Sequence, residues 1–335
     1  MIGESGTELL PGRRYAFDHA WEQLPAGSTH LDVPDVAVDA NDWVYVLGRR
    51  SPQIWVYDET GRFVRSFGDG ILSDRPHGIA VAKSGLVYCA DTPLHVVHVF
   101  DSTGDLVRTL GTKGTPSDTG FDPSISDPHL AYESVRRPGG PFNQPAGVAI
   151  GLDDDVYVAD GYGNARIHHF DADGRLLGSW GSPGFGDGEF HLPHALAVTS
   201  DGRVVVADRE NDRLQLFASD GQWLASWSNV QRPAGVAIDQ SGIVYVAELT
   251  RGKTERSFAH GYPERALTGC VALLDLSGAL LGRYVATGDP CGPDELADPH
   301  GIAVDSKGNI YVAEVSFTGL GRQDCHTLQR LARRA

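Results

Sequence analysis

The chain has 335 residues, of which 41% are hydrophobic, and it carries 41 glycines and 19 prolines. This composition is typical of a packed β protein with many turns. The formal net charge of −16 is scattered along the chain and argues against a nucleic-acid partner, because binding to a phosphate backbone needs a positive stripe.

A unit of two short apolar strands recurs along the chain, and each copy starts at a proline. The first copy is VPDVAVDANDWVYVLG from Val33, and later copies begin RPHGIAV, QPAGVAI, LPHALAV, RPAGVAI and DPHGIAV. The marker prolines are Pro34, Pro76, Pro145, Pro193, Pro233 and Pro299, at intervals of 42, 69, 48, 40 and 66 residues. Several copies continue into a third and a fourth strand. A period of about 40 to 45 residues with four strands is typical of a propeller blade.

Six units predict an all-β fold, a single six-bladed β-propeller over residues 1–335 with four antiparallel strands per blade. The two long intervals contain insertions without strand pattern, at residues 112–144 and 249–269. Both hold His, Tyr and Arg, so we expect both to fold over a site. Residues 23–25 and the C-terminal QDCHTLQRLARRA are the two candidates for sealing the ring, and the latter reads as a short helix or a frayed tail.

The residue after each marker proline lies near the mouth of the central channel. Around the ring this position is occupied by Asp35, His77, Ala146, His194, Ala234 and His300. Alternate blades of a six-fold ring lie about 120° apart, so the three histidines are expected to converge on the axis. Three neutral imidazoles with an open fourth position are typical of a catalytic zinc site. Zinc is preferred because nothing suggests a square ligand plane, and another divalent transition metal such as iron is the alternative.

The same segments resemble the peptidyl-α-hydroxyglycine α-amidating lyases, the lyase half of the peptide-amidating enzyme, which are six-bladed NHL-type propellers. LPHALAV…VVVADRENDRLQLF is similar to the zinc-ligand stretch of that family and its ADRENGRIQ segment, and VYVADGYGNARIHHF resembles its DGYxNxRI segment. RPHGIAV and DPHGIAV look like its other two histidine blades. The resemblance spans roughly residues 30–315.

This resemblance implies the roles of individual residues. The zinc ligands fall on His77, His194 and His300. The catalytic tyrosine falls on Tyr162, and the arginine for the substrate carboxylate falls on Arg49, with Arg50 as the neighbouring candidate. The implied reaction cleaves the C–N bond of an N-acyl-α-hydroxyglycine, giving an amide and glyoxylate. Zinc would hold the hydroxyl oxygen, the tyrosine would remove its proton, and the arginine fork would match the carboxylate.

The chain departs from the family pattern at the structural calcium site. The family places a carboxylate directly after the third histidine, where this chain has Gly301. Asp35 is a possible replacement, so a structural calcium ion stays open. Asp208 and Arg209 are expected to latch blades together, and the carboxylates recurring at the ends of second strands are expected to be structural.

Two other functions stay open: a metal-dependent hydration, dehydration or hydrolysis on the same scaffold, and a non-enzymatic interaction propeller. For the enzyme, the expected partner is a small-molecule substrate, without a membrane partner, and the protein is expected to be a monomer or small homo-oligomer. The N-terminus has no apolar h-region and the four cysteines lack metal spacing, which predicts a cytoplasmic protein with reduced thiols. A Cys270–Cys291 pairing is the alternative.

Overall fold

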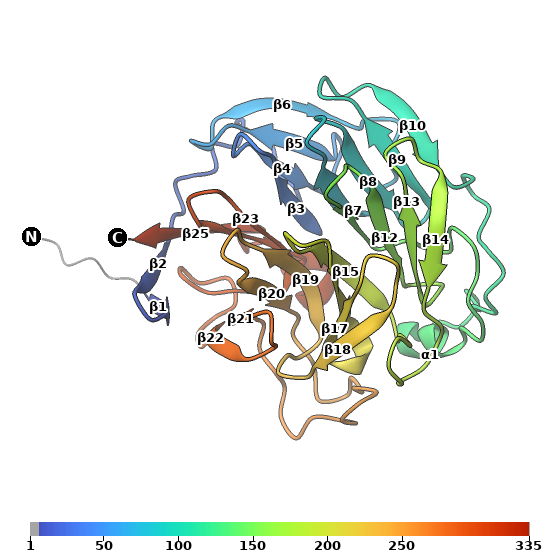
Figure 1. The fold of residues 1–335 in the computed structure, drawn as a ribbon. Helices are drawn as coiled ribbons and strands as arrows, with labels where there is room; N and C mark the ends of the chain where they lie inside the picture. The colour runs from blue at the N-terminus through green and yellow to red at the C-terminus, as the bar shows by residue number, and fades with distance from the viewer. Residues whose placement is uncertain (1–6, 335) are drawn as a thin grey trace, which may run out of the picture.

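The computed structural model describes residues 7–334, which form six antiparallel sheets around a central axis (Figure 1). The first blade contains β3 (Asp35–Val38), β4 (Val44–Leu47), β5 (Ile54–Tyr57) and β6 (Phe63–Phe67). The second blade contains β7 (Pro76–Val81), β8 (Val87–Asp91), β9 (Val96–Phe100) and β10 (Leu106–Leu110). The third blade contains β11 (Gly147–Ile150), β12 (Val156–Asp160), β13 (Arg166–Phe170) and β14 (Leu176–Trp180). The next two contain β15 (Pro193–Val198), β16 (Val204–Asp208), β17 (Arg213–Phe217), β18 (Trp223–Trp227); β19 (Pro233–Ile238), β20 (Val244–Glu248), β21 (Cys270–Leu274), β22 (Leu280–Val285). The predicted all-β, six-bladed propeller with four antiparallel strands per blade is confirmed.

The sixth blade joins the two ends of the described chain. It contains β23 (Pro299–Val304), β24 (Ile310–Glu314) and β25 (Leu328–Arg334), and β2 (Arg13–Phe17) pairs with β25, followed outward by β1 (Thr7–Leu10). The prediction of a helix or frayed tail at the C-terminus is therefore wrong, because the segment gains backbone partners from both β24 and β2. Residues 23–25 do not seal the ring, since Gln23 bridges to Arg62 of the first blade.

The first strand of every blade faces the axis. These strands, β3, β7, β11, β15, β19 and β23, contact one another in a closed ring. The core lies between adjacent blades, where alternating apolar side chains interdigitate. Val44 and Val46 of the first blade, for example, pack against Tyr311 of the sixth.

The carboxylates at the ends of the second strands have the structural role predicted for them. Asp91, Asp160, Asp208 and Glu314 are fully buried, and each accepts a backbone N–H from the segment that leads into its own blade. These bonds satisfy amides that would otherwise be buried without a partner. In these four blades they also hold the start of the first strand, and with it the residue after the marker proline, in a fixed place.

The cysteine prediction is wrong for two of the four residues. Cys291 and Cys325 form a disulfide between the β22–β23 connection and the β24–β25 connection, while Cys89 and Cys270 are free and buried. The alternative Cys270–Cys291 pairing does not form. Across residues 7–334, no helix is long and apolar enough to cross a membrane.

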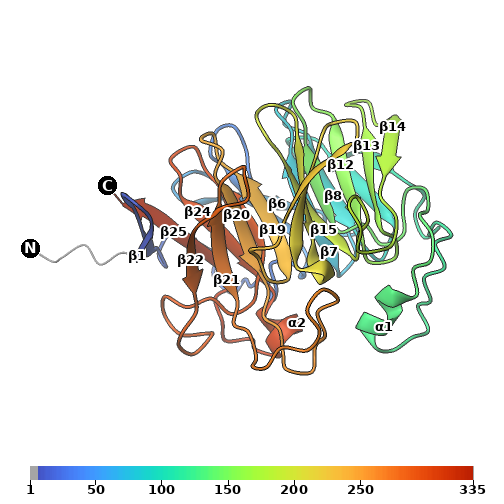
Figure 2. The ribbon, with the colours of Figure 1, turned by 60° about the horizontal axis from the view of Figure 1, so that its bottom comes forward.

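Three short helical segments interrupt the strands: α1 (Pro128–Glu133), the 3-10 turn η1 (Arg209–Asn211) and α2 (Ser316–Leu320). α1 belongs to the first insertion and starts at Asp127, whose side chain accepts the backbone N–H groups of His129 and Leu130. Figure 2 shows that α1, α2 and the second insertion lie on the same face of the ring. This face carries the site described next.

Candidate functional site: a histidine trio beneath two insertions

The three histidines that follow marker prolines meet on the axis. His77 on β7, His194 on β15 and His300 on β23 are almost completely buried, and their ring centroids are 4.7 to 4.8 Å apart. One ligand atom from each lies within 4.8 Å of those of the other two. The convergence expected from the sequence is therefore present.

Backbone carbonyl groups orient all three rings. Nδ1 of His77 lies 3.1 Å from the carbonyl oxygen of Ala146, Nδ1 of His194 lies 2.6 Å from that of Ala234, and Nδ1 of His300 lies 2.6 Å from that of Pro34. A carbonyl oxygen only accepts hydrogen bonds, so each Nδ1 carries the proton and each Nε2 keeps its lone pair. This is the second-shell arrangement that prepares histidines to bind a metal.

The protonation state of the trio also fits a metal. Burial, reinforced by nearby cations, lowers the pKa of His300 to about 3 and holds the pKa values of His77 and His194 well below their usual range. All three are therefore neutral near pH 7, as ligation requires. Three neutral imidazole nitrogens facing one point suit zinc or a similar transition metal.

Tyr162 lies over the trio. It follows β12, and its hydroxyl is 2.8 Å from Nε2 of His77 and 3.0 Å from Nε2 of His194. Nη1 of Arg209 donates to the same hydroxyl at 3.0 Å, and the guanidinium lies 5.2 Å from the centre of the tyrosine ring. Arg209 is buried and lies in η1, directly after β16.

The predicted latch between blades does not form as expected: Asp208 is structural, but its bonds stay within the fourth blade, whereas Arg209 reaches Tyr162 of the third blade. Asp208 accepts Nε of Arg213 at 2.8 Å and the backbone N–H of His191, both structural contacts. Arg209 instead points at Tyr162, and its Nε donates to Glu210 at 2.8 Å. The segment ADREND singles out Arg209 as a candidate, but only the folded position of η1 shows that its side chain points to Tyr162 near the axis.

Glu210 is the residue that the sequence reasoning missed. It is fully buried, and it pairs with Arg209 at 2.8 Å, with Arg232 at 3.3 Å and with Arg251 at 3.6 Å. Burial alone would raise the pKa of Glu210, but the three guanidinium groups hold it well below its usual value. The carboxylate therefore anchors the second insertion, which carries Arg251, beside the trio.

Arg49 lines a cavity above the histidine trio, and neighbouring side chains hold it in place. Its Nη1 lies 3.1 Å from Oδ2 of Asp32 and 2.6 Å from the hydroxyl of Thr318, while its Nε is buried without a hydrogen-bond partner among residues 7–334. Arg75, two residues before His77, lines the cavity too and forms no ion pair within the described part of the chain. Arg50 is exposed and does not line it.

The cavity above the trio has a volume of about 680 Å³ and is rich in arginine. Its walls include Tyr162 and His300 from the ring, His129 and Tyr132 from the first insertion, and Glu255 from the second. Both insertions therefore fold over the site. Although the whole chain is acidic, the five arginines that line this cavity outnumber its carboxyls Glu255 and Asp298 and favour an anionic ligand: Arg49, Arg75, Arg209, Arg232 and Arg251.

The residues near Gly301 do not fit a structural calcium ion. A Cβ atom added to Gly301 would lie 2.5 Å from Oδ1 of Asp35, so this aspartate fills the space beside the glycine. Both oxygens of Asp35 already accept backbone N–H groups, from Val36 and from Ile79, at 2.9 Å. Donors aimed at both oxygens satisfy the carboxylate without a cation.

Comparisons with known proteins agree with the repeat. Three segments match the NHL repeat model: residues 142–170, 190–217 and 296–316. The chain is 30% identical over 325 residues to NHL repeat-containing protein 3 of Homo sapiens, with 90% of this chain and 81% of that protein covered. The chain belongs to the NHL-repeat family. The name of this human relative states no activity.

Other relatives of this NHL-repeat protein carry the name of a lyase. It is 32% identical over 203 residues to the probable peptidyl-alpha-hydroxyglycine alpha-amidating lyase of Caenorhabditis elegans, covering 59% of this chain and 49% of that protein. The resemblance to the amidating lyases is thus confirmed, over about half of that relative's length. Among solved structures, a streptogramin B lyase superimposes with a TM-score of 0.58 at 12% identity, covering 98% of this chain and 100% of the other. That similarity concerns the fold.

Proposed function

We propose that this NHL-repeat protein is a metal-dependent lyase that cleaves the C–N bond of a small N-acyl-α-hydroxyglycine or a similar carbinol, releasing an amide and glyoxylate or a similar aldehyde. One observation carries the proposal. The hydroxyl of Tyr162 lies within 3.0 Å of Nε2 of both His77 and His194, in a cavity that also holds Arg49 and Arg209. A proton acceptor, a metal-binding trio and carboxylate-binding groups are thus in reach of one small substrate.

His77, His194 and His300 are the residues that would hold the metal, with zinc preferred. A zinc ion bound there supplies Lewis acidity, which polarises a substrate oxygen. The name of the Caenorhabditis elegans relative supports a lyase reaction on a peptidyl-α-hydroxyglycine. The described residues around Asp35 give no support for a second, structural calcium ion.

The protein's own residues account for the proton. In the reacting state Tyr162 is the phenolate; its oxygen accepts the proton of the carbinol hydroxyl, the O–H electron pair becomes the new C=O bond, and the C–N electron pair passes to the amide nitrogen. Tyr162 then returns the proton to that nitrogen, so atoms and charge balance. The guanidinium of Arg209, 3.0 Å away, stabilises negative charge on the phenolic oxygen. Arg49 binds and orients the substrate carboxylate.

Two measurements test this function. Elemental analysis of the purified protein should give about one zinc or similar ion per chain, and chromatography should detect glyoxylate from an N-acyl-α-hydroxyglycine. Metal without glyoxylate would favour hydration, dehydration or hydrolysis in the same cavity, which the trio could equally serve. Neither metal nor turnover would favour an interaction propeller.

Location and assembly are further proposals. The Cys291–Cys325 disulfide argues against the cytoplasmic location predicted from the sequence, because disulfides persist mainly in oxidising compartments. Cell fractionation decides between the two. A monomer or small homo-oligomer remains the expectation, which light scattering of the purified protein checks.

A further inference from the structure

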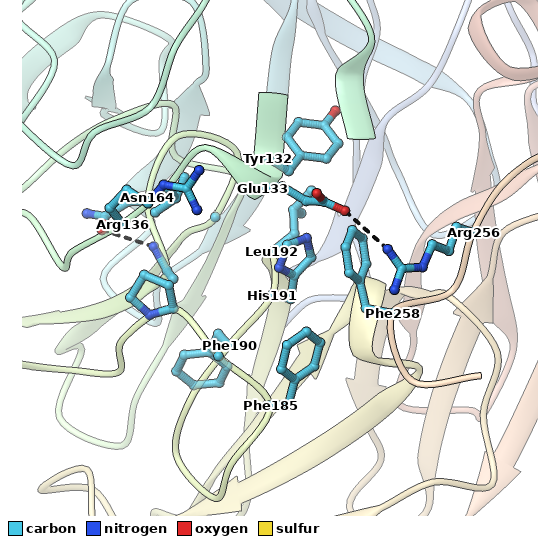
Figure 3. Close-up of a pocket in the computed structure, with 15 residues that line it drawn as sticks. Tyr132, Glu133, Arg136, Asn164, Phe185, Phe190, His191, Leu192, Arg256 and Phe258 are labelled. Atoms are coloured by element: carbon cyan, nitrogen blue, oxygen red, sulfur yellow. Dashed lines mark hydrogen bonds and ion pairs between the residues drawn. The ribbon is translucent and has the colours of Figure 1, made fainter. Parts of the chain in front are cut away.

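A second cavity, of about 360 Å³, lies beside the histidine cavity and is aromatic in character. Figure 3 shows the side chains that line it, with Tyr132 at one end, Phe185 and Phe190 at the other, and His191 and Phe258 between them. The function proposed above uses none of the first four residues. The ring opening is therefore flanked by an apolar pocket that still lacks a role.

Four separate segments line this aromatic pocket, one of them the β12–β13 connection with Gly161 and Asn164. Phe190 and His191 precede β15, Tyr132 comes from the first insertion, and Phe258 comes from the second. The rings of His191 and Phe258 are 3.8 Å apart between centroids, and the backbone N–H of Phe258 donates to the carbonyl oxygen of Glu210 at 3.1 Å. The second insertion is thus fastened to the buried anchor of the catalytic cavity, which fixes the wall of the pocket.

One aromatic side chain is left without a full covering. Phe185 follows Gly184 on the loop before β15, and it is 57% exposed although it faces the pocket. Its ring lies parallel to His191 at 6.3 Å between centroids, with an interplanar angle of 3°. A large aromatic side chain held in this way at a pocket rim gains contacts when an apolar group enters.

The aromatic pocket continues from the histidine cavity. Tyr132 lines both cavities, and its ring centroid lies 5.7 Å from that of Tyr162. Gly161 and Leu192 of the pocket are close in sequence to Tyr162 and His194. A substrate whose reacting carbon lies below Tyr162 therefore has an apolar space within reach on the far side of a single ring.

The two cavities differ in polarity in a way that sets the orientation of a substrate. Five arginines line the histidine cavity, whereas the second cavity has a cluster of aromatic rings with polar groups, among them Arg136 and Asn164, on its other walls. At the rim of the second, Arg256 and Glu133 pair at 3.6 Å and join the two insertions, which neutralises both charges (Figure 3). A carboxylate is attracted to the first cavity and an apolar group to the second.

We propose that the aromatic pocket is the subsite for an apolar, aromatic group on the acyl side of the substrate. The proposal rests on the proposed function for the direction of the substrate: carboxylate towards the arginines, acyl group past Tyr132 towards Phe185 and Phe258. The protein then selects N-arylacyl or aromatic-residue substrates over those with a small acyl group.

Calorimetry on the protein as purified tests this subsite without turnover. N-phenylacetylglycine and N-acetylglycine lack the carbinol hydroxyl and cannot be cleaved. We expect the phenylacetyl compound to bind at least about tenfold more tightly, a usual effect of burying an apolar group in a matched pocket. Phe258→Ala and Phe185→Ala should each reduce this preference several-fold. Tyr262→Ala, an exposed aromatic of the same insertion outside the pocket, should leave it unchanged.

The kinetic arm separates the subsite from the function. The substrates for this arm are the α-hydroxy forms of the two probes, N-phenylacetyl- and N-acetyl-α-hydroxyglycine. If both release glyoxylate at equal kcat/KM, and the two glycine probes bind equally, the subsite is wrong while the lyase function stands. If no glyoxylate appears but the binding preference is present and is lost in Phe258→Ala, the lyase function is wrong while the subsite stands. If Phe258→Ala weakened the binding of both probes by the same factor, this would also contradict an acyl subsite.

Discussion

The hydroxyl of Tyr162, on the third blade, lies 2.8 Å from Nε2 of His77 on the second. Replacing Tyr162 with Phe removes the proton acceptor and keeps the ring that packs against Tyr132. We expect turnover to fall at least 100-fold, the usual range for the loss of a general base, while bound metal stays unchanged. Parallel assays of glyoxylate and metal content check this. Tyr262→Phe is the matched control, and full activity in Tyr162→Phe would refute the assignment.

Removing one imidazole from the trio should remove the ion. His194→Ala leaves two ring nitrogens, too few to hold a transition metal tightly, so metal content and activity should be lost together. His19→Ala alters a half-exposed histidine that pairs with Asp294 on the surface, and it should retain both. Elemental analysis of the two variants decides. A full complement of metal in His194→Ala would place the ion elsewhere.

Two adjacent arginines offer a sharp comparison for the carboxylate site. Arg49 lines the cavity, whereas its neighbour Arg50 is exposed outside it. If the guanidinium of Arg49 holds the substrate carboxylate, Arg49→Ala should raise KM at least about tenfold, because a charge-assisted hydrogen bond is lost. Arg50→Ala should match the wild type. The same KM in both variants would show that another arginine binds the substrate carboxylate, and Arg75, which also lines the cavity, would be tested next.

The buried carboxyl of Asp35 should make stability depend on pH. Burial raises its pKa from 3.8 to about 7, although the amides of Ile79 and Val36 partly oppose the shift. Between those two values the folded protein holds a proton that the unfolded chain releases, so this carboxyl costs stability as the pH rises through the window. From pH 5 to pH 8 the cost grows by about 2 to 3 kcal/mol.

Asp35→Asn cannot ionise and escapes this cost. Urea unfolding at pH 5 and pH 8, with a chelator present, should therefore show the variant gaining on the wild type at the higher pH. Asp74→Asn, on an exposed loop, serves as the control. A constant difference between Asp35→Asn and wild type at the two pH values would show that Asp35 does not titrate in this range.

Thiol counting tests the disulfide. After unfolding without reductant, two of the four cysteines should react with Ellman's reagent, namely Cys89 and Cys270. The double variant Cys291→Ser/Cys325→Ser should lose about 3 to 4 kcal/mol of stability, since the bond closes a loop whose ends are 34 residues apart. Four reactive thiols in the unreduced protein would instead support the reduced state expected from the sequence.

The ring and the trio are visible in the sequence because both depend on local patterns that repeat. Each blade carries its own proline and its own alternating strands, and five of the six end their second strand in a buried carboxylate, so the copies reinforce one interpretation. Position in the repeat then translates directly into position on the axis, which is why His77, His194 and His300 could be brought together without a structure.

Features that depend on distant segments could not be predicted in this way. The C-terminal LQRLARR has no strong strand pattern, and it becomes a strand because β24 and β2 flank it. The positions of Arg209 and Glu210 become clear only when the turn after β16 directs the first to Tyr162 and buries the second between Arg209, Arg232 and Arg251 of the second insertion. The partner of Cys291 likewise depends on how two loops meet.

The closure of the sixth blade has a consequence for the order of events during synthesis. His77 and His194 leave the ribosome well before His300, which lies on the blade that the N-terminal strand β2 must complete. The seam between β2 and β25 therefore forms last, and it fixes the blade that holds His300. If the trio binds an ion as proposed, its full three-histidine geometry is in place only once the two ends of the described chain have paired.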